Sequence, residues 1–402
     1  MNILFLTMSR IQNLEQRGIY SDLLRTFISA GHSVTIAAPA ERRFDEPTNL
    51  CTYAGYAVLR IRVGNLQKTN VIEKGISTVL LESQFLHAIK KHLHDIKFDL
   101  VLYATPPITF AKVISYIKRR DGAKSYLLLK DIFPQNAVDL RMFSKKSPLY
   151  WYFRRKEKNL YKLSDAIGCM SEANVQYVLQ HNKNIDKERV HVSPNSIAPV
   201  LKHRSEEKKR EIRERWNIPE DRTVFVYGGN LGKPQNIPFV IKCLRANAEK
   251  KDRFFVVSGT GTDFPKLKRY VETEKPENVL LINGLPKDEY EELITACDIG
   301  LIFLDHRFTI PNFPSRLLAY MQNSMPVLAC TDTNTDVGKV ITEGDFGWWC
   351  ESRDEWEVAA KMDCACAADL KLKGENAREY LLTHYTVERS FQIIMGECNE
   401  DF

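Results

Sequence analysis

The stretch PNFPSRLLAYMQNSMPVLACTD, Pro311 to Asp332, combines a loop, a short helix and a buried strand, with Pro314 at the expected helix start and Pro326 just before the strand. A helix that joins one apolar strand to the next is typical of a crossover between parallel strands. At the carboxyl edge of such sheets, the turn from strand to helix binds phosphates through free backbone N–H groups. The polar first turn, Ser315 and Arg316, is therefore a candidate phosphate site.

The same alternation extends through the rest of the chain. In the first half we expect helices at Ser21–Ala30 and Glu82–Asp95, and strands at Asn2–Thr7, Ser33–Ala38, Leu100–Ala104, Tyr126–Leu129 and Ala166–Met170. In the second half we expect strands at Thr223–Tyr227, Phe254–Ser258, Val279–Ile282, Ile299–Leu304 and Val327–Cys330. The pattern pauses in the charge-rich stretch from Pro194 to Arg222, which is the expected junction. These features predict two similar α/β domains with doubly wound parallel sheets that face each other, with a ligand held between them.

Length and composition agree with this division. A chain of 402 residues with 44% hydrophobic content exceeds the size at which single cores stop growing, so two domains are expected. The nine cysteines lack the paired spacing of a zinc site, which indicates free thiols and a reducing cytosol. The amino-terminal apolar run is too short for a signal peptide, and no run approaches the roughly 18 apolar residues of a membrane span.

Charge is divided unevenly between the halves. Residues 1–200 hold 29 Lys and Arg against 17 Asp and Glu, or +12, whereas residues 201–402 hold 28 against 34, or −6. Aromatic and basic residues mix in Ser144–Leu163, a composition that suits the surface of an anionic membrane. An ordinary helix with a solvated basic face, or a site for nucleic acid or another polyanion, would explain the same pattern. The residues expected to contact the membrane are Lys145, Lys146, Trp151, Arg154 and Arg155.

Two glycine-bearing turns follow strands of the second half. GGNLGKPQN, Gly228 to Asn236, lacks both the GxGxxG spacing and the ending of a Walker loop, and SGTGTD, Ser258 to Asp263, follows the next strand. Either turn alone is more often a tight connection than a ligand site. Together at one sheet edge they favour a nucleotide, because glycines let backbone N–H groups approach a diphosphate and Lys233 adds charge.

Several motifs in order carry a resemblance to a known family. The second half contains YGGNLGKPQNI, VVSGTGTDFPKLK, NVLLINGLPKDEYEELITACDIGLIFLD, FPSRLLAYMQNSMPVLACTD and NAREYLLTHYTVERS, between Tyr227 and Ser390. This set resembles the donor half of family-4 glycosyltransferases of the GT-B fold. The first half contains HSVTIAAP, DLVLYATPP, KDIFPQNAVDL and VHVSPNS. These are similar to the subgroup that builds capsule and O-antigen repeat units and includes N-acetylfucosamine transferases.

The resemblance implies a retaining, metal-independent transferase without a cofactor, whose donor is a UDP-sugar. It implies an acceptor domain of residues 1–198, onto which a helix at 385–402 packs back, and a donor domain of residues 199–384. The family commonly carries two glutamates around the quoted helix, but Pro311 and Ala319 occupy those positions here. The residues expected to bind the donor are Gly228, Gly229, Asn230, Lys233, Gln235, Gly259, Asp305, Pro314, Ser315, Arg316, Thr331 and Asp332.

The acceptor side is expected in the first domain, at Arg17, Gly18 and Pro106. Asp131, at a strand end, is a candidate base, although a capping carboxylate would fit the same place, and Arg316 is the expected stabiliser of the leaving diphosphate. We expect transfer of an N-acetylated 6-deoxyhexose such as L-FucNAc to an undecaprenyl-diphosphate-linked saccharide. The enzyme would lie on the inner face of the cell membrane and bind no nucleic acid. A sugar-nucleotide epimerase and a non-catalytic partner subunit are the alternatives.

Overall fold

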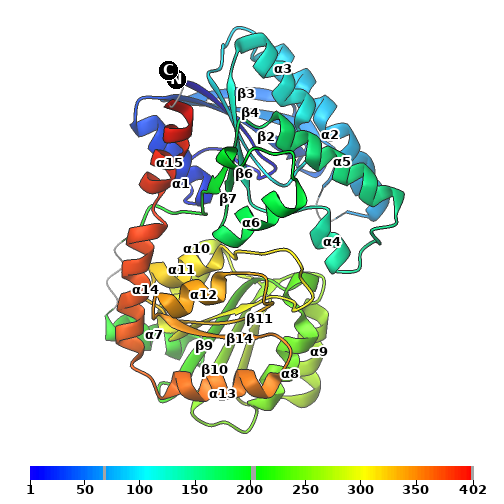
Figure 1. The fold of residues 1–402 in the computed structure, drawn as a ribbon. Helices are drawn as coiled ribbons and strands as arrows, with labels where there is room; N and C mark the ends of the chain where they lie inside the picture. The colour runs from blue at the N-terminus through cyan, green and yellow to red at the C-terminus, as the bar shows by residue number, and fades with distance from the viewer. Residues whose placement is uncertain (67–68, 201–204, 400–402) are drawn as a thin grey trace. The chain divides into compact units, whose positions relative to one another are not determined.

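The computed structural model describes residues 1–66, 69–200 and 205–399, which form two compact units (Figure 1). The first unit is Met1–Ala198 with Thr386–Phe402, and the second is Pro199–Tyr385. Tyr385 thus belongs to the second unit. Of the expected domains, residues 201–204 and 400–402 lie outside the described part of the chain.

The first unit is built on an eight-stranded sheet of order β3-β4-β2-β1-β5-β6-β7-β8. All neighbouring strands pair in parallel except β3 and β4, which form an antiparallel hairpin at one edge. The strands are β1 Asn2–Leu6, β2 Ser33–Glu41, β3 Asn49–Tyr53, β4 Tyr56–Val63, β5 Leu100–Ala104, β6 Lys124–Leu129, β7 Ala166–Cys169 and β8 Val190–Val192. Strand order reverses between β1 and β5, which is where doubly wound sheets bind ligands.

Helices cover both faces of this sheet. The helices of the first unit are α1 Ile19–Ser29, α2 Val71–His92, α3 Ala111–Asp121, α4 Gln135–Asp139, α5 Pro148–Leu163, α6 Glu172–His181 and α15 Val387–Asn399. Helices α1 and α15 share one hydrophobic cluster with the strands, and the rings of Phe27 and Phe391 lie 4.9 Å apart. The C-terminal helix therefore packs back on the first unit. It is tied there by a bridge between Ile197 and Thr386, in which Val387 N–H donates to the Ile197 carbonyl at 3.1 Å.

The second unit has a six-stranded parallel sheet of order β11-β10-β9-β12-β13-β14. Its strands are β9 Thr223–Asn230, β10 Arg253–Thr260, β11 Val279–Ile282, β12 Ile299–Phe303, β13 Val327–Thr331 and β14 Gly347–Glu351. Its helices are α7 Glu206–Arg215, α8 Ile237–Ala246, α9 Phe264–Glu274, α10 Lys287–Leu293, α11 Arg316–Gln322, α12 Val337–Glu343, α13 Glu355–Cys366 and α14 Leu370–His384. Strand order reverses between β9 and β12.

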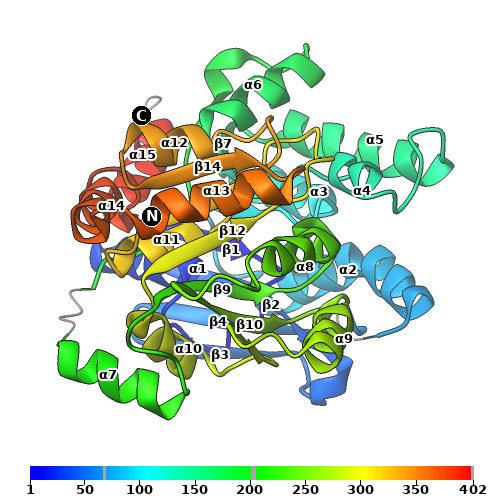
Figure 2. The ribbon, with the colours of Figure 1, turned by 90° about the horizontal axis from the view of Figure 1, so that it is seen from below.

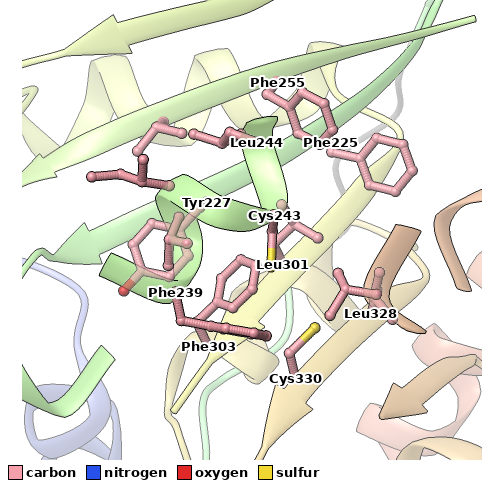
Figure 3. Packing of buried hydrophobic residues seen from close by; sticks show 14 of the residues in the cluster. Phe225, Tyr227, Phe239, Cys243, Leu244, Phe255, Leu301, Phe303, Leu328 and Cys330 are labelled. Carbon is pink, nitrogen blue, oxygen red and sulfur yellow. The ribbon is translucent and has the colours of Figure 1, made fainter. Parts of the chain in front are cut away.

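The core of the second unit lies between its sheet and helices α8, α9 and α13. Figure 3 shows Phe225, Tyr227 and Phe303 from the strands packing against α8, and α8, α9 and α13 cover the same face of the sheet in Figures 1 and 2. Helices α11 and α12 cover the opposite face. Because both faces are covered, the strands are buried runs of apolar residues rather than alternating ones.

The structure confirms the predicted class of two Rossmann-like α/β domains, with informative differences in the elements. Strands β5 and β11 have the predicted bounds. Helix α2 begins eleven residues earlier than the predicted start at Glu82, because the Asn70 side chain accepts a hydrogen bond from Glu73 N–H and caps the helix. The predicted interruption from Pro194 to Arg222 contains helix α7. The β3–β4 hairpin, helix α3 and strand β14 had no counterpart in the prediction.

Candidate functional site

The reversal of strand order in the second unit places β9 beside β12, two strands far apart in sequence. They pair only at Ile299 with Phe225 and at Gly300 with Val226, and beyond that point they diverge. Between diverging parallel strands at such a reversal, backbone groups at the carboxyl ends are left facing a crevice. This point is the natural candidate for a ligand site in the second unit.

Helix α11 is fixed over the gap between these strands by Tyr320. Its ring is fully buried, and its hydroxyl shares one proton between the carbonyls of Val226 on β9, at 3.2 Å, and Leu301 on β12, at 3.0 Å. Gly300 is required beneath it, because a Cβ there would lie 2.4 Å from the Tyr320 ring. A buried phenol with satisfied hydrogen bonds therefore sets the position of α11.

Arg316 lies one helical turn before Tyr320, so both side chains extend from one face of α11. Its guanidinium carbon is 4.3 Å from the centre of the Tyr227 ring on β9, within cation–π range. The Nη1 atom is buried and has no hydrogen-bond partner among the described residues. Such an unmet donor costs about 1–3 kcal/mol, and arginine cannot relieve the cost by losing its proton. An anion that reached this guanidinium would recover that energy.

The turn that contains Gly228 and Gly229 lies at the carboxyl end of β9 and passes directly beside the guanidinium. Gly229 has φ of 121°, a conformation that favours glycine, and a Cβ there would lie 3.4 Å from Arg316 Nη2. A Cβ on Gly228 would lie 1.9 Å from the Tyr290 hydroxyl. Both glycines are thus needed for the turn to approach Arg316 and Tyr290 so closely.

Gly259 and Gly261, the glycines of SGTGTD, are required for a different reason from Gly228 and Gly229. A Cβ on Gly259 would lie 1.9 Å from the Gly229 carbonyl oxygen, and one on Gly261 would lie 2.3 Å from that of Leu231. The two turns are joined by backbone hydrogen bonds, including Leu231 N–H to the Thr260 carbonyl at 2.9 Å. The close packing of the end of β10 and the turn after it against the end of β9 therefore explains these glycines without a ligand, and the expected contact of Gly259 with the donor stays a prediction.

The polar side chains of the GGNLGKPQN loop differ in whether they already have hydrogen-bond partners. Gln235 is buried, and its Oε1 accepts from Asn230 Nδ2 at 3.0 Å and from Gly232 N–H at 3.2 Å. Asn230 and Gln235 thus hold the shape of the loop. Lys233 is exposed, and its ammonium group makes no hydrogen bond or ion pair in the described part of the chain.

The strand ends after β12 and β13 are held by internal contacts. Asp305 is fully buried, and burial by itself would raise its pKa; hydrogen bonds from the Arg307 side chain and backbone outweigh this and lower the pKa. Thr331 accepts from Trp349 Nε1 at 2.9 Å. Asp332 Oδ1 accepts the N–H groups of Asn334, at 2.8 Å, and Thr335, at 2.9 Å. All three expected donor contacts therefore already have structural partners.

The two positions where acidic residues were expected lie before α11 and within it. They hold Pro311, which is buried, and Ala319, which is half-buried, and neither side chain carries a carboxylate. Pro314 and exposed Ser315 directly precede the helix, and the Ser315 side chain makes no capping hydrogen bond. Among the described residues, no group of three or more His, Cys, Asp or Glu side chains could hold a metal ion. Arg316 supplies a positive charge at the first turn of α11.

In the first unit, Asp131 follows β6 at the carboxyl edge of the sheet. Burial raises the pKa of its carboxyl group to about 6, against the opposing effect of Asn136, whose Nδ2 lies 2.8 Å from each carboxylate oxygen. The ammonium group of its neighbour Lys130 donates a long hydrogen bond, 3.4 Å, to the Ser193 carbonyl, and burial lowers the pKa of Lys130 to about 7. A carboxylate whose pKa is raised toward neutrality is suited to accept a proton.

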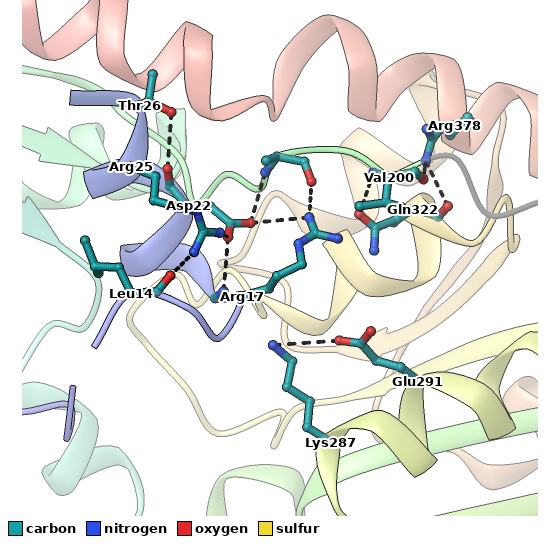
Figure 4. Close-up of polar contacts among 12 residues, drawn as sticks. Leu14, Arg17, Asp22, Arg25, Thr26, Val200, Lys287, Glu291, Gln322 and Arg378 are labelled. Atoms are coloured by element: carbon teal, nitrogen blue, oxygen red, sulfur yellow. Dashed lines mark hydrogen bonds and ion pairs between the residues drawn. The ribbon is translucent and has the colours of Figure 1, made fainter. Parts of the chain in front are cut away.

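Arg17 and Gly18, expected at the acceptor, belong to a network around Asp22 (Figure 4). Asp22 is 2% exposed and accepts from the N–H groups of Gly18, at 3.3 Å, and Ala198, at 3.1 Å. The Arg17 guanidinium donates to the Ala198 carbonyl and lies 3.5 Å from Asp22. These contacts fix the end of the first unit, so they explain Arg17 without an acceptor. The loop before α1 and the first residues of α1, between Ser9 and Ser21, line a cavity of about 630 Å³. Pro106 is exposed after β5.

Comparison with known proteins covers both units. Residues 20–200 match the family Glycosyltransferase Family 4, and residues 208–378 match Glycosyl transferases group 1. The chain carries both domains of a GT-B glycosyltransferase. This glycosyltransferase is 24% identical over 325 residues, 79% of its length and 78% of the relative's, to the protein named "Probable glycosyltransferase WbjE" of Pseudomonas aeruginosa.

Solved structures share the fold of this glycosyltransferase. The crystal structure of Anabaena HepE in complex with UDP and glucose matches with a TM-score of 0.71 at 15% identity, covering 98% of each chain. A structure described as "Trehalose-6-phosphate from E. coli bound with UDP-2-fluoro glucose" matches with a TM-score of 0.72 at 11% identity, covering 100% of this chain and 99% of that one. At these identities the similarity establishes the fold alone.

The glycosyltransferase also has an exposed aromatic and basic surface on α5 and the loop before it. Trp151 is 63% exposed, and Lys145, Lys146 and Arg155 are exposed. Arg154 differs, because it pairs with Glu157 and donates to the His181 carbonyl at 2.8 Å. The expectation that Arg154 faces a membrane is therefore not supported, since its guanidinium is held inside the unit. Among the described residues, no helix is both long and apolar enough to cross a membrane.

Sequence reasoning missed four residues that build these sites. Tyr227, Tyr290 and Tyr320 surround Arg316, and Lys130 adjoins Asp131. Tyr320 had a visible signal, four residues after Arg316 on the same helix. Lys130 could have been found as the first residue of KDIFP, next to Asp131 at a strand end. Tyr227 and Tyr290 gave no signal, because only the order of strands brings them to α11.

Proposed function

We propose that this glycosyltransferase moves a sugar from UDP to a lipid-linked saccharide acceptor, with retention of configuration. The observation that carries the proposal is the Arg316 guanidinium. It is a half-buried cation whose buried Nη1 donor is unmet, and it lies beside a glycine turn at the strand reversal of the second unit. Guanidinium groups bind diphosphates through paired hydrogen bonds, and a preorganised cation stabilises the charge that develops on a leaving diphosphate.

In this proposal, Arg316 holds the diphosphate and Lys233 adds a second positive charge from the loop after β9. The backbone N–H groups of the Gly228–Gly229 turn contribute further donors, so no metal or other cofactor is required. Gly259, Asp305, Thr331 and Asp332 support these groups by fixing the neighbouring turns. The donor and its leaving group are thus stabilised by side chains and backbone of the second unit.

On the acceptor side, Asp131 receives the proton of the attacking hydroxyl. A carboxylate with a pKa of about 6 is charged at neutral pH and remains a useful base there. The acceptor is a saccharide on undecaprenyl diphosphate, and the transferred sugar is an N-acetylated 6-deoxyhexose such as L-FucNAc. Synthesis of capsule or O-antigen repeat units is the corresponding process.

The enzyme acts at the cytoplasmic face of the inner membrane. Support comes from the exposed surface of Lys145, Lys146, Trp151 and Arg155. Basic residues near an anionic membrane contribute about 1 kcal/mol each, and exposed tryptophan settles at the level of the lipid headgroups.

The test is an incubation of the purified enzyme with a panel of UDP-sugars and a monosaccharide linked to prenyl diphosphate. We expect release of UDP and formation of a disaccharide-lipid with one donor of the panel. A folded protein that binds UDP but consumes no donor with any such acceptor would contradict the proposal. It would favour the alternative of a partner subunit that binds a nucleotide without catalysis.

A further inference from the structure

Lys130 lies at the carboxyl edge of the first sheet, in the position next to Asp131. It directly follows β6, and its backbone N–H donates to Thr105 Oγ1, just after the neighbouring strand β5, at 3.1 Å. Its side chain extends the other way, so that Nζ lies 3.4 Å from the carbonyl oxygen of Ser193, just after β8. Because β7 lies between β6 and β8, the side chain crosses the end of β7. The Lys130 ammonium group therefore lies at the sheet edge where α/β domains bind ligands.

The Lys130 ammonium group has no negatively charged partner among the described residues. Its hydrogen bond to Ser193 is long and is made to a neutral carbonyl oxygen. Burial lowers the pKa of Lys130 to about 7, and no carboxylate opposes this effect. Asp131 is not a partner, because successive side chains of a strand point to opposite sides and its carboxylate oxygens instead lie 2.8 Å from Asn136 Nδ2. The charge of Lys130 is therefore left uncompensated.

Lys118 of α3 shows how the same unit compensates a lysine that has a structural role. Its Nζ donates to Ser125 Oγ at 3.2 Å and to the Leu163 carbonyl at 3.0 Å, and it lies 2.7 and 2.6 Å from the two carboxylate oxygens of Asp165. An ammonium group has three donors, and Lys118 has close acceptors for all of them. Lys130 is half-buried like Lys118 but has one distant acceptor. Because lysines taken out of water are normally paired, this difference indicates an anion that the chain itself does not supply.

A second polar group after β6 has an unmet hydrogen bond of the opposite kind. The Asn136 amide donates to Asp131 through Nδ2, whereas its Oδ1 is buried and has no hydrogen-bond partner among the described residues. An amide oxygen can only accept and an ammonium group can only donate. A ligand that satisfies both groups must carry an anion for Lys130 and a hydroxyl for Asn136. A sugar phosphate carries both on one small scaffold.

We propose that Lys130 and Asn136 bind a sugar phosphate, with the phosphate at Lys130 Nζ and a ring hydroxyl donating to Asn136 Oδ1. This inference rests on the proposed function, because it takes the sugar phosphate to be the part of the lipid-linked acceptor where the first sugar joins the diphosphate. Asp131 lies between the two residues in sequence and faces the hydroxyl that attacks, while Lys130 holds the phosphate on the other side of the strand end. The bound phosphate also raises the pKa of Lys130 again, since a nearby negative charge favours the ammonium form.

The first experiment measures binding of N-acetylglucosamine linked to farnesyl diphosphate, by calorimetry below the micellar concentration of this probe. Saturating UDP is present throughout, so that the donor site is filled and does not contribute. Lys130→Met and Lys130→Gln both remove the charge, and the matched control Lys187→Met removes one charge at an exposed position before β8. We expect the Kd of the probe to rise roughly tenfold or more in both Lys130 variants, and the control to match the wild type. Thermal unfolding checks that each variant folds, and the Tm should change little because Lys130 has only one long hydrogen bond.

A second probe, octyl N-acetylglucosaminide, has the same sugar without a phosphate. The wild type should bind it more weakly than the diphosphate probe, and the difference between the two probes should shrink in the Lys130 variants. Equal weakening of both probes would overturn the assignment of Lys130 to the phosphate. Unchanged binding of the diphosphate probe in both variants would overturn it as well, as would an equal loss in the Lys187 control.

The binding measurement separates this inference from the proposed function, because it requires no sugar transfer. If the wild type transfers sugar from no UDP-sugar while the Lys130 variants lose affinity for the diphosphate probe, the proposed function fails and the sugar-phosphate site stands. Where transfer is observed, we expect the ratio of kcat/KM for the diphosphate acceptor to that for the octyl glycoside to fall roughly tenfold in the Lys130 variants. An unchanged ratio would leave the proposed function standing and overturn the sugar-phosphate site.

Discussion

Replacement of Arg316 by methionine should separate nucleotide binding from folding stability. Methionine keeps an apolar stem against Tyr227 but removes the guanidinium. The loss of the cation–π contact costs about 0.5–2 kcal/mol, whereas removal of the unmet buried Nη1 donor recovers about 1–3 kcal/mol. The free energy of unfolding without ligand should therefore change by between about 1 kcal/mol of loss and about 2.5 kcal/mol of gain, with stabilisation favoured. For a unit of this size, each 1 kcal/mol shifts the Tm by about 2–4 °C.

The substitution should change the affinity for UDP more than it changes the free energy of unfolding, and it should only weaken binding. Hydrogen bonds from a charged donor to a diphosphate contribute about 1.5–3 kcal/mol, so the Kd for UDP should rise roughly 10- to 150-fold. Calorimetry measures the Kd, and thermal unfolding with and without UDP measures the stabilisation by the bound nucleotide. A useful contrast is Arg307→Met, which leaves the buried Asp305 carboxylate without its main partner and should lower the Tm even without UDP.

Two results would refute this reasoning. If Arg316→Met bound UDP within threefold of the wild type, Arg316 would not be the diphosphate group. If the variant were destabilised by more than about 3 kcal/mol without ligand, the guanidinium would have internal partners that the geometry does not contain. Either result would move the donor site to other residues.

Three further predictions concern other parts of the chain. Burial raises the pKa of Asp131 to about 6, so between about pH 4 and 6 the folded chain keeps a proton that the unfolded chain has released. The free energy of unfolding should therefore fall as pH rises through this window. Asp131→Asn should abolish that fall in pH-dependent denaturation curves and greatly reduce sugar transfer. Gly259→Ala places a Cβ 1.9 Å from a backbone oxygen and should destabilise the second unit by several kcal/mol. In contrast, the Cβ of Gly396→Ala in α15 meets nothing within 4 Å, and this variant should stabilise the chain by about 0.5–1 kcal/mol. Urea titrations that gave the two variants equal stability would contradict the packing argument. Asp22→Ala removes the acceptor of the Gly18 and Ala198 N–H groups and the carboxylate partner of Arg17 and Arg25, so it should cost about 2–4 kcal/mol. A loss below about 0.5 kcal/mol would show that the network contributes little.

Local pattern predicted the elements where the signal lay within a few residues. Leu100–Ala104 and Val279–Ile282 are uninterrupted apolar runs between polar residues, and both strands have the predicted bounds. The first half of α2 was missed because it contains Gly75, which lowers helix propensity. The helix forms there with the help of the Asn70 cap. The β3–β4 hairpin was missed because β3 is a short edge strand whose pairing with β4 is a tertiary contact.

The sequence by itself determined that this protein is a pair of α/β domains, and it located Arg316 at the start of a helix and Asp131 at the end of a strand. These conclusions depend on alternating apolar runs and turns, which are local properties of the chain. The tertiary structure alone decided which groups surround Arg316, because strand order brings β9 and β12 together and lets Tyr320 bridge their carbonyls. It also decided that Gly259 packs against a neighbouring turn and that Arg154 and Arg17 are held by internal partners. Side-chain types show what a residue can bind, but only the fold shows which of its donors are still unpaired.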